Sequence, residues 1–275
     1  MRAFVFSNFF IAICAVAMCW QTVYLFQLRE AKELLPFVFF STMASYSFHW
    51  YLSMDTAGDR SRENWLKRYR PLHMALLIAG IAGLLYFGMG LLAWWPWLLL
   101  TAFATFLYSA PKLPWPIFRW LRKVALGKTF FLAAVWVHVT TILPLLMSDQ
   151  QWTAAFSLFV LSRFFLIYAI CIIFDLRDRE NDRRMGIRSL ITWLNIAQIR
   201  ILFSFSIFVC IITTVLLGLF HFGIGQVLVL LLPGLLTALS YPLASRHFSD
   251  LLYYAWLDGL MALSAFLFFL ANLIK

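Results

Sequence analysis

Charged residues are scarce in this chain: only 12% of its 275 residues are Asp, Glu, Lys or Arg, whereas 63% are hydrophobic. Soluble domains are about half apolar and about a quarter charged, so a soluble core cannot bury this much apolar side chain. The scarcity excludes an ordinary soluble protein and predicts a polytopic membrane protein. The net charge of +10 does not indicate a nucleic-acid partner, because the basic residues lie in loops between the apolar runs, where anionic lipid headgroups account for them.

Cysteine is also rare and shows no metal-binding pattern. The four cysteines, Cys14, Cys19, Cys171 and Cys210, lie inside apolar runs and form no C-x-x-C pair, which is typical of small buried hydrophobic residues. The sequence also lacks a nucleophilic triad motif, a glycine-rich phosphate loop, a haem motif and a zinc cluster. We therefore do not expect those kinds of chemistry.

Long apolar runs make up most of the chain. A spanning helix needs about 20 apolar residues, and several runs of this kind are separated only by short, weakly charged breaks. The pattern predicts an all-α polytopic membrane bundle of about nine transmembrane helices, with residues 1–275 forming a single integral-membrane domain. The predicted spans are residues 4–27, 34–53, 72–92, 94–110, 128–147, 152–174, 199–219, 223–243 and 250–273.

Basic residues are distributed unevenly between alternate loops. The connections 54–71, 111–127 and 175–198 are long and basic, whereas the loops on the other side hold only Arg29 and Lys32 as basic residues. The positive-inside rule places the basic loops and the N-terminus in the cytoplasm. We therefore expect an integral protein of the bacterial inner membrane, in contact with membrane lipids.

The oddest stretch follows the sixth predicted span and reads "FDLRDRENDRRMGIRSL" over residues 174–190. Asp175, Asp178 and Asp182 are spaced i, i+3, i+7, which puts them on one face of a helix. Clustered carboxylates repel one another unless cations lie between them, and their hard oxygens suit Mg²⁺ together with a phosphate group. A solvated charge run with local ion pairs is the alternative interpretation.

The surrounding residues resemble the second aspartate-rich motif of the UbiA superfamily of intramembrane prenyltransferases, D-x-R-D-x-E-x-D-x-x-x-G-x-x-[ST]-L. The segment "LYSAPKLP" at 107–114 is similar to the Y-[ST]-x-P-x-K segment of that family. Nine spans, with acidic motifs after the second and sixth, are also its layout. The motif residues that match are Asp175, Arg177, Asp178, Glu180, Asp182, Gly186, Ser189 and Leu190.

The resemblance implies a Mg²⁺-dependent enzyme that ionises an isoprenyl diphosphate and transfers the prenyl group to an aromatic or other lipophilic acceptor. It implies a catalytic and metal-binding role for Asp175, Asp178 and Asp182. Lys112 would stabilise the leaving diphosphate as a point charge. The implied substrate contacts at the cytoplasmic mouth are Tyr108, Lys128 and Arg188.

The first acidic motif of the family, N-D-x-x-D-x-x-x-D, is altered here. The corresponding stretch is "YSFHWYLSMDTAGDRSREN" at 46–64, in which Phe48 and Tyr51 stand where acids are expected. Asp55 and Asp59 remain and are candidates for a second metal site, whereas plain loop charges near a turn are the alternative. The later "RYRPL" segment at 68–72 also permits a different register, and both registers stay open.

Two further polar residues lie inside predicted spans and are candidate substrate-binding residues. His49 lies about one turn from the cytoplasmic end of the second span, where a hydrogen-bonded structural role is the alternative. Arg163 is the most deeply placed charge and precedes Asp175 by about 18 Å along a helix. An intramembrane arginine usually faces the protein interior, either toward acceptor polar groups or toward an acid such as Asp258.

Two other functions compete with prenyl transfer. The altered first motif favours a non-catalytic UbiA-like membrane protein that binds a polyprenyl lipid or a partner without turnover. A transporter is the further alternative, kept open by Arg163, Asp258 and His138 within the spans. The sparse charge at the predicted midplane argues against transport, because transport sites need polar groups there.

Overall fold

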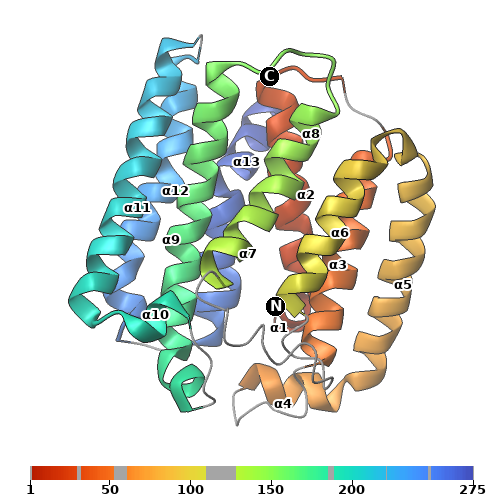
Figure 1. The fold of residues 1–275 in the computed structure, drawn as a ribbon, viewed down its shortest axis with the longest axis vertical. Helices are drawn as coiled ribbons and strands as arrows, with labels where there is room; N and C mark the ends of the chain where they lie inside the picture. Colours follow the sequence, from red (N-terminus) through yellow and green to blue (C-terminus); the bar gives the residue numbers. More distant parts are fainter. Residues whose placement is uncertain are drawn as a thin grey trace.

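The computed structural model describes residues 2–29, 32–52, 61–109, 128–184, 189–220, 222–246 and 249–274. Within these ranges every regular element is helical, and Figure 1 shows the long helices running side by side as a bundle. The elements are α1 (Arg2–Phe6), α2 (Phe9–Leu25), α3 (Leu34–Tyr51), α4 (Ser61–Arg68), α5 (Arg70–Met89), η1 (Leu92–Trp94), α6 (Trp95–Ser109), α7 (Lys128–Val137), η6 (His138–Ile142), α8 (Leu143–Leu146), α9 (Ala154–Arg184), α10 (Leu190–Trp193), α11 (Ile196–Leu216), η7 (Leu217–Leu219), α12 (Ile224–Ala244), η8 (Leu252–Leu257) and α13 (Asp258–Leu273).

The all-α membrane architecture predicted from the apolar runs is confirmed. Each predicted span overlaps a long helix or a nearly continuous helical pair, because apolar side chains favour burial and each helix satisfies its own backbone hydrogen bonds. In the described part of the chain, six helices are long and apolar enough to cross a membrane. Nine crossings therefore remain a prediction, as α2 and the apolar stretch Leu92–Leu107 are shorter.

Helix α9 lies near the middle of the bundle, between the α11–α12 pair and the α2–α7 pair (Figure 1). Its side chains Ile167, Ile170 and Ile172 are almost completely buried. These residues pack with α2, α7, α11 and α13 into a continuous hydrophobic core. A helix surrounded in this way positions the residues at both of its ends.

Helices α3 and α5 pack closely because glycines face the contact. A Cβ added at Gly80 would come 2.8 Å from the backbone nitrogen of Ala44, and one added at Gly83 would come 2.3 Å from the Phe40 ring. Small residues allow such close approach of helices inside membranes. The opposite face of α5 is exposed, with Ile78, Leu85 and other apolar side chains pointing outward, as expected for contact with lipid tails.

The sixth span does not end where the sequence pattern predicted. Residues 152–174 were expected to form the span and 175–198 a loop, but α9 continues without a break to Arg184. The acidic motif is therefore helical at least to that residue. From residue 189 onward, capping boxes at Ser189 and Asn195 begin α10 and α11.

Candidate functional site

The three aspartates of the acidic motif lie on the last turns of α9. Asp175 and Asp182 are buried, with 8% and 5% of their surfaces exposed, and the Asp178 side chain between them is 27% exposed. The i, i+3, i+7 spacing thus places them toward the protein, as expected for one helix face. The neighbouring Glu180 and Arg184 are highly exposed and form a long surface pair at 3.6 Å.

Asp175 is held by the first turn of α7. The Thr129 hydroxyl donates a short hydrogen bond to Asp175 Oδ2, and both residues are buried. This contact joins residues 46 positions apart. Thr129 was not singled out from the sequence; its position directly after Lys128, a residue predicted to border the mouth, is the available signal.

Asp178 is bound by the adjacent Arg177 through two parallel hydrogen bonds. Arg177 Nε and Nη2 donate to the two carboxylate oxygens, each at 2.9 Å. Charge-assisted bidentate pairs of this type are the stronger class of hydrogen bond. Arg177 Nη2 also donates to the Tyr254 hydroxyl at 3.2 Å. This bond connects the ion pair to η8, the segment that continues into α13.

Aromatic rings surround the Arg177 guanidinium. Its central carbon lies 5.2 Å from the ring centroid of Phe174, 4.5 Å from that of Tyr253 and 5.1 Å from that of Tyr254. Each geometry allows a cation–π interaction. We call Arg177 together with Phe174, Tyr253 and Tyr254 the arginine cage.

The two tyrosines of the arginine cage lie on the π-helical segment η8. A π-helical turn widens the helix by one residue and often occurs at functional sites. Tyr253 also donates from its hydroxyl to the Ala244 carbonyl at 2.9 Å. The segment therefore fixes both rings against α9 and against the end of α12.

The other arginines near the end of α9 have structural contacts. Arg179 donates to the carbonyls of Ile191 and Leu194. Arg183 donates twice to the Thr192 carbonyl, at 3.0 and 2.8 Å. These bonds satisfy backbone acceptors around α10 and fold the following segment back onto the helix.

His49 belongs to the same end of the bundle, where α3 and α6 finish. Its Nδ1 lies 3.4 Å from the Ser109 hydroxyl. Nearby, Arg70 stacks 5.3 Å from the Tyr51 ring centroid and donates to the Tyr51 hydroxyl at 3.4 Å. The ends of α3 and α6, the start of α7 and the end of α9 are at the lower end in Figure 1.

Arg163 lies elsewhere. It is on α9 twelve residues before Asp175, which is about 18 Å along the helix. It is 3% exposed and donates a short hydrogen bond to Gln21 Oε1 on α2. The structure therefore separates Arg163 from the acidic end. Of the predicted site residues whose side chains are described, Asp175, Asp178, Asp182 and His49 lie at that end.

Several predicted site residues cannot be placed. Asp55, Asp59, Lys112 and Arg188 lie outside the described residues, as do the side chains of Tyr108 and Lys128.

The acidic end provides oxygen donors of the type that magnesium prefers. The ion commonly takes one or two carboxylates and completes its shell with water and phosphate oxygens. Among the described residues, however, no group of three His, Cys, Asp or Glu side chains is gathered closely enough to hold a metal. The donor chemistry thus fits magnesium, while Thr129 and Arg177 already engage two of the carboxylates.

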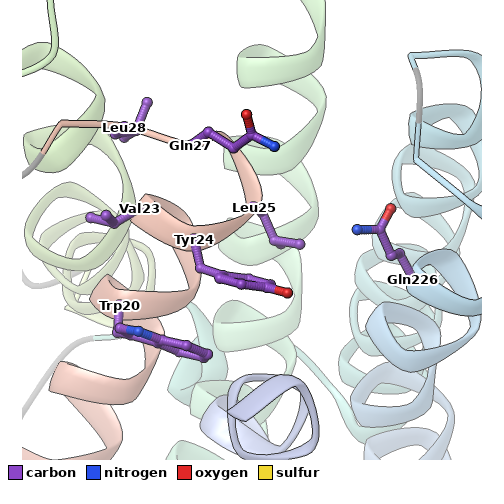
Figure 2. A pocket seen from close by; sticks show the side chains of 7 residues that line it. All are labelled: Trp20, Val23, Tyr24, Leu25, Gln27, Leu28 and Gln226. Carbon is purple, nitrogen blue, oxygen red and sulfur yellow. The ribbon is translucent and has the colours of Figure 1, made fainter. Parts of the chain in front are cut away.

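A hollow is present at the other end of the bundle. Figure 2 shows it between the end of α2 and Gln226 at the start of α12. Its volume is about 410 Å³. The Trp20 and Tyr24 rings are stacked along it, 5.1 Å apart. None of the predicted site residues is in its lining, which consists of Trp20, Val23, Tyr24, Leu25, Gln27, Leu28 and Gln226.

The chain has the fold of a solved UbiA homologue. The apo structure of a UbiA homolog from Aeropyrum pernix K1 superposes with a TM-score of 0.69, covering 96% of this chain and 97% of the other at 13% sequence identity. No family model and no curated protein matches the chain. The UbiA-like fold predicted from the acidic motif is therefore confirmed.

Proposed function

We propose that this protein is an integral-membrane, Mg²⁺-dependent prenyltransferase that acts on an isoprenyl diphosphate and a lipophilic acceptor, aromatic or otherwise. The observation that carries the proposal is the row of aspartates on α9, which meets a buried arginine and aromatic rings at one end of a UbiA-like fold. Carboxylates suit the metal–diphosphate end, and an apolar bundle suits the prenyl tail. The proposed site is at the cytoplasmic face.

In this proposal, Asp175, Asp178 and Asp182 hold magnesium on the diphosphate, with Asp55 and Asp59 as ligands of a second ion. Bound magnesium would supply charge neutralisation to the leaving group. The allylic carbon–oxygen bond breaks, diphosphate leaves with the electron pair, and the acceptor attacks the allylic carbon and then releases a proton. The side chains proposed to contact substrate are Lys112, Tyr108, Lys128, Arg188 and His49.

Asp178 must exchange one partner for another in this reaction. Both of its oxygens accept hydrogen bonds from Arg177, so metal binding has to compete with a bidentate ion pair. The rings and the Tyr254 hydroxyl would keep the guanidinium in place while the carboxylate turns toward metal. Arg177 would then lie beside the diphosphate as a fixed positive charge.

The test is diphosphate release from labelled prenyl diphosphates of several chain lengths by purified protein, with aromatic acceptors, in the presence and absence of Mg²⁺. We expect Asp175→Ala and Asp178→Ala to reduce metal-dependent release by at least about 100-fold, because each removes charge stabilisation from the transition state. Asp149→Asn is the matched control, since Asp149 is exposed at the opposite end of the bundle. Release that is unchanged in both alanine variants would contradict the proposal.

A non-catalytic lipid-binding role is the second candidate. It is favoured by the bidentate Arg177–Asp178 pair, which occupies a proposed metal ligand, and by the altered first acidic motif. It predicts that folded protein binds a prenyl diphosphate without releasing diphosphate at any Mg²⁺ concentration. Failure of both binding and release would favour transport instead, with Arg163, Asp258 and His138 as the residues to change.

A further inference from the structure

A buried polar cluster lies in the bundle well away from the acidic motif. It consists of Gln21 on α2, Arg163 on α9 and Ser264 on α13, which are 0%, 3% and 3% exposed. Arg163 lies nine residues into α9, near the end opposite the aspartates. The cluster therefore joins three helices within the apolar part of the molecule.

The hydrogen bonds fix the orientation of the Gln21 amide. Gln21 Oε1 accepts from Arg163 Nη2 and also from the Ser264 hydroxyl, the latter at 3.1 Å. Turning the amide around would place its NH₂ group against Arg163 Nη2, so that two donors face each other and the bond from the arginine is lost. The Gln21 NH₂ group must therefore point away from Arg163 Nη2 and Ser264.

Two buried donors of the cluster have no acceptor. Over the described ranges, Gln21 Nε2 and Arg163 Nη1 form no hydrogen bond. An unsatisfied buried donor is costly, and a buried positive charge is more costly still. The Phe159 ring, with its centroid 4.8 Å from the guanidinium carbon, offsets only part of that cost.

We infer that Gln21 and Arg163 form a binding site for a compact monoanion, such as chloride. An anion accepts hydrogen bonds from both donors and neutralises the guanidinium. A water molecule would also accept the hydrogen bonds but would leave the positive charge uncompensated. The near-complete burial of both side chains favours a single ion over a bulky headgroup or acceptor. The bound ion would tie α2, α9 and α13 together, independently of prenyl transfer.

The test is thermal unfolding of the purified protein in detergent at equal concentrations of sodium chloride, bromide or gluconate. Chloride and bromide are expected to raise the Tm by about 4–8 °C over gluconate, since a ligand that binds only the native state stabilises it. Arg163→Gln should abolish this difference. Arg184→Gln, the same replacement at a highly exposed arginine, should retain it.

A second measurement does not depend on any variant folding. Crystals of the unmodified protein grown in bromide should show an anomalous peak beside Gln21 Nε2 and Arg163 Nη1. Equal Tm values in all three salts, or no bromide peak at this position, would overturn the inference. Sodium benzoate is measured as a fourth salt. Stabilisation by benzoate without any halide effect would also overturn the inference, because the site would then take the carboxylate of a larger molecule.

Discussion

Helix α9 carries two buried arginines whose surroundings differ sharply. Arg177, near the acidic end, is paired with both oxygens of Asp178 and is enclosed by three rings. Arg163, about 21 Å earlier along the same helix, donates to the neutral amide of Gln21 where Arg177 has a carboxylate. Both arginines keep Nη1 without a hydrogen-bond partner in the described structure, so the difference between them is the charge of the acceptor. The first charge is compensated within the chain, and we propose that the second is compensated by a bound ion.

The comparison shows that burial alone does not assign a function to an arginine. A buried pair costs desolvation of both charges, and it is retained where geometry and additional hydrogen bonds offset that cost. Arg177 meets these conditions through Asp178 and Tyr254. Arg163 has a neutral amide and the Phe159 ring in their place, and this difference is the ground for the anion site inferred above.

Breaking the compensated pair should have the largest effect. We expect Arg177→Met to lower the free energy of unfolding by about 2–4 kcal/mol, because Asp178 loses its partner and three rings lose their cation. Since Asp178 is partly exposed, the loss should fall below that of a fully buried pair. Equilibrium unfolding in mixed detergent measures it.

The double variant Arg177→Met/Asp178→Asn separates the two causes. If the uncompensated carboxylate causes most of the loss, the double variant should be more stable than Arg177→Met alone. If the double variant is as unstable as Arg177→Met, the lost stability comes from the contacts between the guanidinium and the rings.

The sequence predicted the helix face that carries the aspartates, but it did not predict how far α9 extends. Apolar runs and the i, i+3, i+7 spacing indicated a membrane bundle with Asp175, Asp178 and Asp182 on one helix face, because both follow from local periodicity. The connection predicted from residue 175 onward begins as a helix and not as a loop, because the charged turns continue α9 to Arg184 while their buried face packs against other helices.

The partners of the charged residues could not be read from local patterns. Thr129 lies 46 residues from Asp175, Tyr254 lies 77 residues from Arg177, and Gln21 lies 142 residues from Arg163. Tertiary packing sets such contacts, and an ordinary Thr, Tyr or Gln gives no signal of them. The sequence indicated that Arg163 needed a partner, and it offered Asp258 as an acid without proposing Gln21.

A smaller effect is expected at Asp175, a buried carboxylate of the acidic end. Thr129→Val keeps the shape of the side chain but removes the hydroxyl that donates to Asp175. We expect a loss of about 1–2 kcal/mol in the free energy of unfolding, because a buried carboxylate loses a hydrogen bond. Thr129→Ser, which keeps the donor, should recover most of it, and equal losses in both variants would show that packing rather than the hydrogen bond matters.

The smallest effect should come from giving Arg163 a carboxylate of its own. Gln21→Glu places an acid where the amide now accepts from Nη2, and so makes the Arg163 surroundings resemble those of Arg177. The Tm in gluconate should rise by about 2–4 °C, while the difference between chloride and gluconate should disappear. Gln21→Leu should also lose the halide effect but with a lower Tm, because Arg163 and Ser264 then lose their acceptor. A halide effect of full size in Gln21→Glu would show that the anion binds elsewhere, since an internal carboxylate and a bound anion cannot both neutralise one guanidinium at the same place.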